Sequence, residues 1–303
     1  MPISFRIGSR GSPLALTQAR MVRAALVEAH GWAEDGIEIV PIKTSGDRIQ
    51  DRALADVGGK ALWTKELDRA LIDGEIDCAV HSMKDVETVR PGAIAIAAML
   101  PRADVRDRLL GVDTLDALKP GAVIGTSSPR RSAQLRRLRP DIRITLFRGN
   151  VDTRLSRLNL GEADATLLAA AGLDRLGRPG LGAPVAVETM LPAPAQGAVG
   201  VETLSANQAA LAALAAIDHG DTHRCVLAER ALLAALAADC RSPVAALATI
   251  EGDAIRLRAE ILSPDGREHQ AGEALVRDLA DATALGRALL ARASPTLAAL
   301  FGG

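Results

Sequence analysis

Apolar residues follow two kinds of pattern along the first two thirds of the chain, and the two kinds alternate. Short apolar runs predict strands, whereas an apolar residue at every third or fourth position predicts a helix. In the first third, these patterns predict strands over 3–8, 37–43, 76–82 and 93–100, with helices over 13–30 and 60–73. The last two strand runs are almost wholly apolar, as in strands buried on both faces. This order predicts a parallel or mixed sheet covered by helices.

The same alternation restarts after a charged segment. Strands are predicted over 122–127, 142–147 and 165–169, with helices over 129–139 and 151–160. The segment 101–120, which contains a charged run from Arg102 to Arg108, is interpreted as the crossover between two lobes. A strand-like run at 197–201 follows a return rich in proline and glycine, and we expect it to rejoin the first sheet. The first domain would then be discontinuous in sequence.

The last third of the chain changes character. A long helix over 221–238 precedes strands over 244–250, 255–262 and 268–276, and one helix over 279–300 closes the chain. Ser263-Pro264-Asp265-Gly266 is a hairpin turn sequence between the second and third of these strands. The sequence therefore predicts two α/β lobes and a small C-terminal α+β domain. We place domain 1 at 1–99 and 197–217, domain 2 at 103–192 and domain 3 at 220–303.

Composition narrows the class of protein. The 303 residues are 48% hydrophobic and 24% charged, which is typical of globular domains. A net charge of −1 and an aromatic content of 2% disfavour nucleic-acid binding, which uses positive surfaces and stacked aromatic rings. Three cysteines indicate a reducing compartment rather than a disulfide framework. Without an apolar run of membrane length or a signal-peptide pattern near Met1, we expect a cytoplasmic protein with no membrane partner.

One short pattern occurs in both lobes. Residues 7–14 and 124–130 each run from the end of a predicted strand through Ser-Pro into a predicted helix, with arginine nearby. Serine at the N-cap and proline in the first turn are favoured at helix starts. Such a start also leaves backbone N–H groups and a partial positive charge free to bind an anion. A single occurrence would indicate capping alone; two indicate a cleft in which both lobes bind an acidic ligand.

Arginines are concentrated between residues 130 and 157, a segment that contains nine arginines and only two aspartates. We interpret Arg136, Arg137, Arg139 and Arg143 as a solvated face. Arg130 and Arg131 open a predicted helix, where a cation opposes the helix dipole unless an anion compensates it. Arg148 stands at a strand end before Gly149, which permits close approach of a ligand. Because no P-loop or dinucleotide-binding glycine pattern occurs, carboxylates are the anions that we expect.

A cluster of functional side chains, His81-Ser82-Met83-Lys84-Asp85, follows a buried strand directly. Asp85 is suited to hydrogen-bond an N–H group and to stabilise a cation, or it serves only as a helix cap or turn residue. Lys84 is suited to bind a carboxylate or to form a Schiff base. On extended backbone the two side chains would point in opposite directions.

The three cysteines differ in context. Cys78 and Cys225 fall inside a predicted strand and a predicted helix, so both are expected to pack in the core. Cys240 follows the end of a predicted helix, between Asp239 and Arg241, and is the candidate reactive thiol. The five histidines show no ligand spacing with cysteine, so we expect no metal site.

Together these segments resemble the porphobilinogen deaminase (hydroxymethylbilane synthase) family over essentially the whole chain. Any one block would be unspecific, but seven occur in the family's order. The matching blocks are 9–16 (SRGSPLAL), 57–60 (VGGK), 79–85 (AVHSMKD), 125–131 (GTSSPRR), 148–155 (RGNV with TRL), 196–200 (QGAVG), and Cys240 with Pro243.

The resemblance implies a reaction and a fold. Members condense four porphobilinogen molecules head to tail into the linear tetrapyrrole hydroxymethylbilane and release ammonia each time. In members of the family, the tetrapyrrole grows on one covalent dipyrromethane cofactor, and the enzyme is a monomer. The implied fold is two lobes like those of type II periplasmic binding proteins, followed by a C-terminal domain with the cysteine loop.

The resemblance also implies roles for individual residues. Asp85 matches the catalytic aspartate, and Cys240 matches the thioether anchor of the cofactor. The implied cofactor-binding residues are Lys84, Thr126, Ser128, Arg130, Arg131 and Arg154. The implied substrate-binding residues are Arg10, Ser12, Trp63, Arg148, Arg175 and Gln196.

The chain departs from the family pattern at several of these places. Ala238-Asp239 replaces the usual glycines before the cysteine, Arg241 replaces a neutral residue, and Trp63 replaces phenylalanine. Two other function classes explain parts of the pattern. A bilobal cytosolic binding protein for a polycarboxylate would form no covalent adduct, and a polyanion binder would show steep salt dependence.

Overall fold

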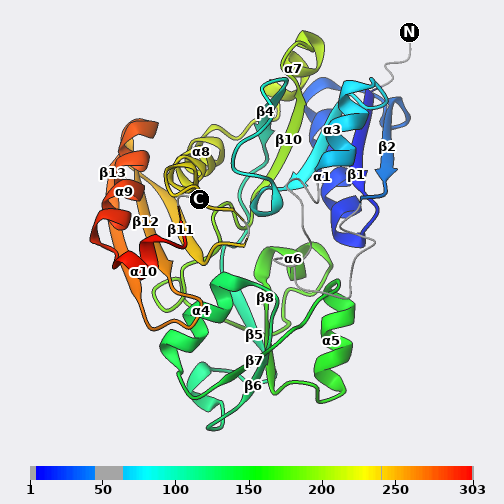
Figure 1. The fold of residues 1–303 in the computed structure, drawn as a ribbon. Helices are drawn as coiled ribbons and strands as arrows, with labels where there is room; N and C mark the ends of the chain where they lie inside the picture. The colour runs from blue at the N-terminus through cyan, green and yellow to red at the C-terminus, as the bar shows by residue number, and fades with distance from the viewer. Residues whose placement is uncertain (1–4, 45–63, 240, 302–303) are drawn as a thin grey trace. The chain divides into compact units, whose positions relative to one another are not determined.

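The computed structural model describes residues 5–44, 64–239 and 241–301, which fall into two compact units (Figure 1). The first unit contains the described residues of 5–44, 64–103 and 197–223. The second contains those of 104–196 and 224–301. No helix among the described residues is both long and apolar enough to cross a membrane.

A mixed five-stranded sheet forms the centre of the first unit, in the order β2-β1-β3-β10-β4. Its strands are β1 (Phe5–Arg10), β2 (Ile37–Ile42), β3 (Cys78–Ser82), β4 (Ile94–Met99) and β10 (Val199–Leu204). The strands β1, β2 and β3 are parallel, whereas β10 is antiparallel to both of its neighbours. The prediction that the late strand rejoins the first sheet is therefore confirmed.

Helices cover both faces of this sheet (Figure 1). They are α1 (Pro13–His30), α3 (Lys65–Ile72) and α7 (Gln208–Ala215), with short 3-10 turns η1 (Glu34–Gly36) and η2 (Met83–Asp85). Cys78 and Val80 of β3 pack with α1 and α7, whereas Ala79 packs with α3. Alternate residues of β3 thus enter two different cores, which is why its sequence is apolar at successive positions. The predicted helix over 13–30 is confirmed, and it ends at Gly31 with a φ of 65°.

The second unit contains another five-stranded sheet, in the order β7-β6-β8-β5-β9. Its strands are β5 (Asp107–Leu110), β6 (Val123–Gly125), β7 (Arg143–Thr145), β8 (Ala165–Ala169) and β9 (Ala183–Pro184). The associated helical segments are η3 (Leu115–Ala117), α4 (Pro129–Leu138), α5 (Val151–Asn159) and α6 (Ala170–Arg175). Strand β6 is parallel to β7 and β8, whereas β5 is antiparallel to β8 and β9.

The interpretation of the whole segment 101–120 as a crossover is wrong, because β5 lies within it. This strand begins with two charged residues, Asp107 and Arg108, which are only 3% and 8% exposed. Both are paired: Asp107 binds two arginines of α4, and Arg108 Nη2 lies 2.8 Å from Asp174 Oδ1. Charge composition predicted a loop, whereas ion pairing with distant residues permits a central strand.

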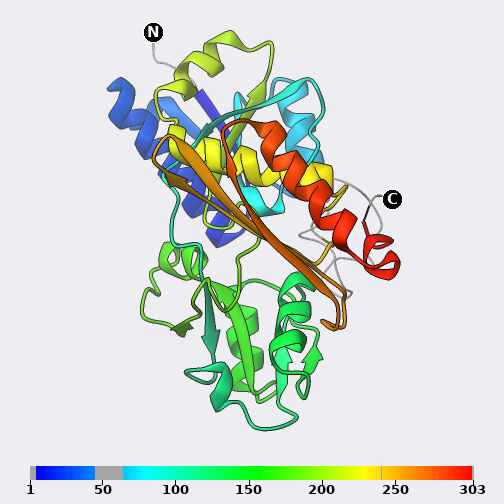
Figure 2. The same cartoon turned by 90° about the vertical axis from the view of Figure 1, so that its left-hand side faces the viewer.

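A three-stranded antiparallel sheet completes the second unit. It contains β11 (Val244–Glu251), β12 (Ala254–Leu262) and β13 (His269–Val276), and its helices are α8 (Gly220–Ala235), α9 (Leu279–Arg292) and α10 (Pro295–Ala298). Figure 2 shows α9 along this sheet. The predicted hairpin between β12 and β13 is confirmed. The single helix predicted over 279–300 is instead two helices, because Ser294 caps a new start at Pro295.

The hairpin between β12 and β13 packs on helix α4. Gly266 has a φ of 73°, and a Cβ atom there would lie 2.5 Å from the carbonyl oxygen of Ala133. Arg136 Nη1 donates to the carbonyl oxygen of Pro264 over 2.8 Å, and Gln134 Nε2 donates to Glu260 Oε1 over 2.6 Å.

The expectation of a solvated α4 face is consequently wrong for Arg136, Arg137 and Arg139. All three are half-buried, and Arg139 donates to the carbonyl oxygens of Leu115 and Leu118. Only Arg143 of the four is exposed. The β12–β13 hairpin covers Arg136 and Arg137, and the segment around η3 covers Arg139, so the sequence of α4 alone does not predict their burial.

Candidate active site

Asp85 lies in an open cavity of the first unit, directly after β3. The cavity encloses about 430 Å³, the open solvent at its mouth included, and Arg10, Ser12, Gln18 and His81 also line it. These residues come from the ends of β1 and β3 and from the start of α1. Parallel strands meet here at their carboxyl ends, where open α/β sheets bind ligands.

The backbone at Asp85 is a 3-10 turn, Met83–Asp85, rather than the extended chain on which we based the side-chain directions of Lys84 and Asp85. Met83 is buried and anchors this turn, because its N–H donates to the carbonyl oxygen of Ala198 over 3.1 Å. Within the described residues, the Asp85 carboxylate makes no hydrogen bond or ion pair. A half-buried carboxylate in a cavity is available to accept an N–H group from a ligand.

Helix α1 begins at the edge of this cavity with the predicted capping chemistry. Ser12 is the N-cap, its hydroxyl accepts the N–H of Ala15 over 3.3 Å, and Pro13 is the first helical residue. The first turn contains no acidic residue, so the positive end of the helix dipole is not neutralised within it. Arg10, at the end of β1, adds a cation to the same cavity.

Helix α4 of the second unit begins in the same way. Ser128 is the N-cap, its hydroxyl accepts the N–H of Arg131 over 3.4 Å, and no acidic residue occurs in the first turn. Thr126 is 2% exposed, and its hydroxyl accepts the N–H of Ser128 over 3.2 Å. The prediction that both Ser-Pro segments cap helices is therefore confirmed.

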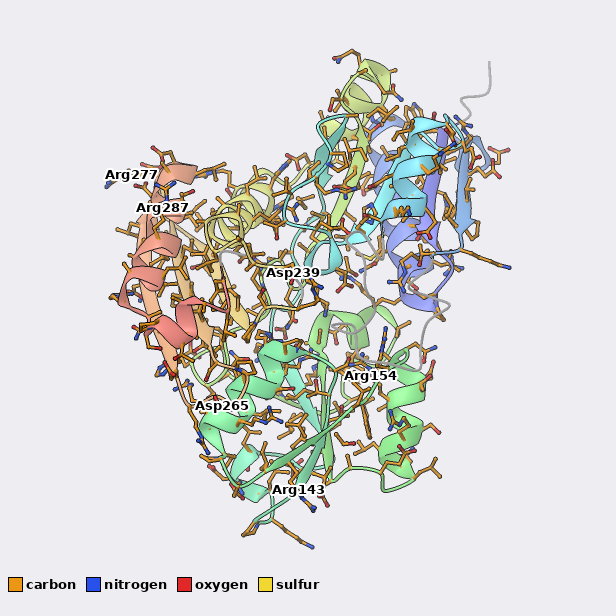
Figure 3. All side chains as sticks on the ribbon, in the orientation of Figure 1. Arg143, Arg154, Asp239, Asp265, Arg277 and Arg287 are labelled. Carbon is orange, nitrogen blue, oxygen red and sulfur yellow. The ribbon has the colours of Figure 1, made fainter. Side chains whose placement is uncertain are left out.

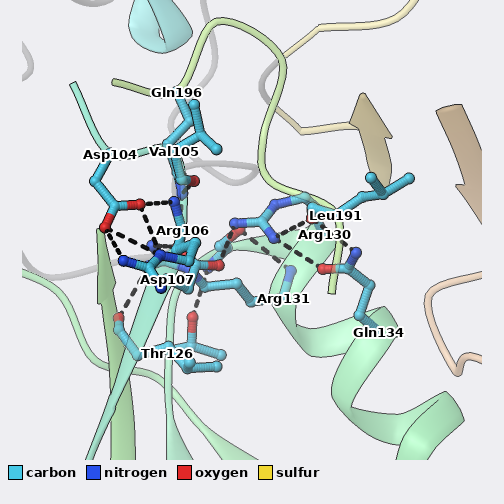
Figure 4. A network of polar contacts seen from close by, with 12 residues as sticks. Asp104, Val105, Arg106, Asp107, Thr126, Arg130, Arg131, Gln134, Leu191 and Gln196 are labelled. Atoms are coloured by element: carbon cyan, nitrogen blue, oxygen red, sulfur yellow. Dashed lines mark hydrogen bonds and ion pairs between the residues drawn. The ribbon is translucent and has the colours of Figure 1, made fainter. Parts of the chain in front are cut away.

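Arg130 and Arg131 both bind one buried aspartate (Figure 4). Arg130 Nη2 lies 2.8 Å from Asp107 Oδ2, and Arg131 Nη2 lies 2.7 Å from Asp107 Oδ1. Gln196 is fully buried, and its Nε2 donates to Asp107 Oδ1 over 2.8 Å and to the carbonyl oxygen of Val105 over 2.7 Å. The anion that compensates these arginines within the protein is Asp107, which sequence reasoning missed.

Electrostatics keep this cluster ionised. Burial alone raises the pKa of Asp107, but the two guanidinium groups outweigh burial and hold that pKa well below its usual range. Burial also lowers the pKa of Arg130, against the attraction of Asp107. Two guanidinium groups share one carboxylate, so these three side chains retain one net positive charge. Among the described residues, the buried Nε of Arg130 has no hydrogen-bond partner.

The other arginines singled out in the sequence lie around α5 and α6. Arg148 is buried and precedes Gly149, whose φ of 100° leads into the N-cap Asn150 of α5. Arg154 Nε donates to the carbonyl oxygen of Gly149 over 3.1 Å. Figure 3 shows Arg154 well apart from the exposed Arg143, which lies at the lower edge of the view. Arg175 closes α6, and burial lowers its pKa.

The cysteines are divided as expected where the structure describes them. Cys78 and Cys225 are both buried in the core, and burial raises the pKa of Cys78. Cys240 and Trp63 lie outside the described residues. Beside Cys240, Arg241 Nη2 lies 2.7 Å from Asp239 Oδ2, and this pairing, against the effect of burial, lowers the pKa of Asp239. In the described part of the chain, no group of three or more His, Cys, Asp or Glu side chains is arranged to hold a metal ion.

A second buried charged cluster was also missed. Glu202 of β10 is fully buried, lies 3.2 Å from His81 Nε2 and binds Arg90. No local pattern reveals this cluster, because Arg90 and Glu202 are 112 positions apart in the chain. An acidic residue that follows the apolar run 197–201 is the sequence signal of it.

Family models match both parts of the chain. Residues 5–212 match "Porphobilinogen deaminase, dipyromethane cofactor binding domain", and residues 223–294 match "Porphobilinogen deaminase, C-terminal domain". The chain is 58% identical to the porphobilinogen deaminase of Sphingopyxis alaskensis, over 98% of this chain and 96% of the relative. It is 50% identical to that of Paracoccus denitrificans, over 93% of this chain and 91% of the relative.

The comparison with solved structures found matches of low identity. The second substrate-binding domain of a putative amino acid ABC transporter from Streptococcus pneumoniae matches with a TM-score of 0.43 and 14% identity, over 75% of this chain and 99% of that one. The VFT2 domain of BvgS from Bordetella pertussis matches with a TM-score of 0.40 and 14% identity, over 75% and 90%. The two family models and the full-length identity of 58% establish that the chain belongs to the porphobilinogen deaminase family.

Proposed function

We propose that Asp85 is the catalytic carboxylate of this chain and that the cationic residues around the two Ser-Pro helix starts bind the carboxylates of its substrate and cofactor. Family membership supplies the reaction: porphobilinogen is deaminated and polymerised into hydroxymethylbilane in tetrapyrrole biosynthesis. The observation that supports the assignment most is the Asp85 carboxylate in a cavity shared with Arg10 and the start of α1.

In this proposal, the Asp85 carboxylate stabilises the positive charge that develops on the substrate during deamination. Positive charge grows on the pyrrole nitrogen as ammonia leaves, and a carboxylate that accepts the pyrrole N–H stabilises that charge. Because the Asp85 carboxylate has no partner among the described residues, its hydrogen-bonding capacity is available to the substrate. Met83 and the end of β3 fix the turn on which it lies.

The carboxylates of the substrate can be bound by arginine side chains and by hydroxyl groups that donate hydrogen bonds. Each porphobilinogen has an acetate and a propionate, so negative charge accumulates as the product grows. We assign Arg10, Arg148 and Arg175 to these groups, because guanidinium binds carboxylates in a bidentate manner. Ser12 keeps its hydroxyl proton while it accepts the N–H of Ala15, so it can still donate. Gln196 and Trp63 complete the proposed substrate set.

The residues present fit a dipyrromethane with several carboxylates. The cluster of Arg130, Arg131 and Asp107 retains a positive charge, and the Nε of Arg130 is buried without a partner among the described residues. The proposed cofactor-binding residues are Lys84, Thr126, Ser128, Arg130, Arg131 and Arg154, with Cys240 as the covalent anchor. When bound, the cofactor supplies a covalent primer on which the product chain is built. One cofactor per chain is proposed, and no metal.

Domain limits, assembly and compartment are part of the same proposal. We place domain 1 at 1–99 and 197–217, domain 2 at 103–192 and domain 3 at 220–303, with the anchor in domain 3. Each chain then contains one complete set of site residues, which supports a monomer. The balanced net charge of −1 and the low count of three cysteines support a cytoplasmic enzyme that binds no nucleic acid.

The intact mass of the denatured protein tests the proposal. A thioether survives denaturation, so freshly purified wild-type protein should be heavier than its sequence by one dipyrromethane unit. Cys240→Ser should lose both this increment and the activity, because a hydroxyl is a far weaker nucleophile. Cys78→Ser and Cys225→Ser are matched controls that should keep the increment. An unmodified mass in active wild-type protein, or an adduct on Cys78 or Cys225, would contradict the assignment.

A further inference from the structure

Buried charged side chains flank the turn of Asp85 on both sides along the chain. His81 stands before the turn at the end of β3, and its side chain is 4% exposed. Arg90 follows the turn, with a side chain that is 7% exposed. Both contact Glu202, the fully buried residue of the neighbouring strand β10.

One carboxylate joins the two flanks. Glu202 Oε1 accepts from Arg90 Nε over 2.9 Å, and Glu202 Oε2 accepts from Arg90 Nη2 over 2.9 Å. The same Oε2 atom lies 3.2 Å from His81 Nε2. Paired N–H donors in this fork geometry fix direction as well as distance. The Arg90 side is fixed by hydrogen bonds, whereas His81 lies within ion-pair distance of Glu202 and is fixed by the pairing of β3 with β10.

Further contacts brace the segment after the turn. Arg90 Nη1 lies 2.7 Å from Glu87 Oε2, and Thr64 donates to the same Glu87 oxygen over 2.7 Å. Arg90 also binds Asp68 of α3. Burial raises the pKa of Asp68, whereas His81 and Arg90 overcome burial and lower the pKa of Glu202 to about 2. The Glu202 carboxylate is therefore ionised at neutral pH.

Stability alone does not account for such a cluster. The desolvation of buried ions offsets much of their attraction, and an apolar set of similar volume is often as stable. The paired hydrogen bonds between Arg90 and Glu202 instead give the backbone beside Asp85 a defined position. Electrostatic stabilisation of a developing charge needs such a fixed position, since a carboxylate displaced by ~1 Å loses up to ~10²-fold in rate.

We infer that Arg90 and Glu202 are positioning residues for catalysis, which hold the Asp85 turn in place from both sides through one buried ion pair. This inference rests on the proposed catalytic role of Asp85. Neither residue faces the substrate in this assignment; both act through the backbone that Asp85 shares with His81 and Arg90.

Two conservative variants test the inference. Glu202→Gln keeps the shape of the side chain and removes its charge, and Arg90→Lys keeps a charge but removes the fork. We expect each to lower kcat by ~10-fold or more, with KM changed by no more than ~2-fold. Intact mass should still show the full covalent adduct, because the cofactor residues are untouched.

Asp68→Asn is the matched control, because Asp68 binds Arg90 but makes no hydrogen bond or ion pair with His81 among the described residues, whereas Glu202 contacts both flanks of the Asp85 turn. Its kcat should stay within ~2-fold of wild type once all variants are assayed below their unfolding temperatures. The inference is overturned if Glu202→Gln and Arg90→Lys keep wild-type kcat, or if Asp68→Asn loses as much as they do. Should Glu202→Gln fail to fold, Arg90→Lys decides alone. A loss of turnover in Asp85→Asn without one in these variants would overturn the positioning role and leave the role of Asp85 intact.

Discussion

The Nη2 atom of Arg130 lies 2.8 Å from the Oδ2 atom of Asp107, and both side chains are almost fully buried. Arg131 binds the other oxygen of the same carboxylate. The first turn of α4 is thereby joined to β5 by an ion pair that excludes water. Asp107 thus fixes the two arginines that we assign to cofactor carboxylates, and its removal should affect both stability and cofactor binding.

Asp107→Asn should destabilise the protein strongly. It leaves two buried guanidinium groups without a carboxylate, and the loss of one partner of a buried pair costs about 3–5 kcal/mol. Denaturant unfolding measures this loss. Glu273→Gln is the control, because its pair with Arg256 is exposed and should be worth at most about 1 kcal/mol. Equal losses in the two variants would contradict the structural role of Asp107.

Acid should destabilise the fold through Glu202. Its pKa is about 2 in the folded protein, below the ordinary value near 4.5, because His81 and Arg90 outweigh burial. A lowered pKa stabilises the fold above the unfolded value, and this contribution, about 3 kcal/mol, is lost as pH falls from about 5 to about 2. The unfolding free energy of Glu202→Gln should therefore fall less steeply than that of wild type over this range. Parallel curves for the two proteins would refute the prediction.

Asp85→Asn should separate catalysis from stability. Removal of one preorganised charge should lower turnover by ~10²-fold or more. Because Asp85 has no partner among the described residues, the unfolding free energy should change by no more than about 0.5 kcal/mol. Steady-state assays and thermal unfolding give the two values. Near wild-type turnover would remove Asp85 from the catalytic assignment.

The arginines should divide into two groups by intact mass. Arg131→Leu should reduce cofactor assembly, since we assign this side chain to charge that is present before any turnover. Asp107 keeps its pair with Arg130 in this variant, so the protein should fold. Arg10→Leu and Arg148→Leu should show the full adduct but stall during elongation. Complete adducts with equal turnover in all three variants would show that the division of roles is incorrect.

Elements with a local sequence signal were predicted well. Residues Pro13–His30 of α1 are predicted at both ends, because Ser12 and Gly31 supply the cap and the stop. Residues Ala165–Ala169 of β8 are predicted likewise from their apolar run. Strand β5 was missed because its charged residues are buried by partners that lie more than twenty positions away. Local composition does not contain such pairings.

The candidate site shows the same division. The capping roles of Ser12 and Ser128 follow from neighbouring residues and were predicted. The 3-10 turn at Asp85 depends on Met83, which bonds to Ala198 of a segment that returns much later in the chain. The links of Glu202 to both flanks of that turn depend on the same return. Sequence patterns therefore proposed candidate site residues but did not predict the contacts that hold them.

Gly266 has an implication for exchanging parts between relatives. Any side chain at this position would meet the backbone of α4 at Ala133, and the hairpin also accepts a hydrogen bond from Arg136. A C-terminal segment transplanted from a relative would therefore need a matching α4 to receive it. Chimeras that carry the second lobe together with the C-terminal sheet should assemble, whereas those joined between them would place two unmatched surfaces in contact.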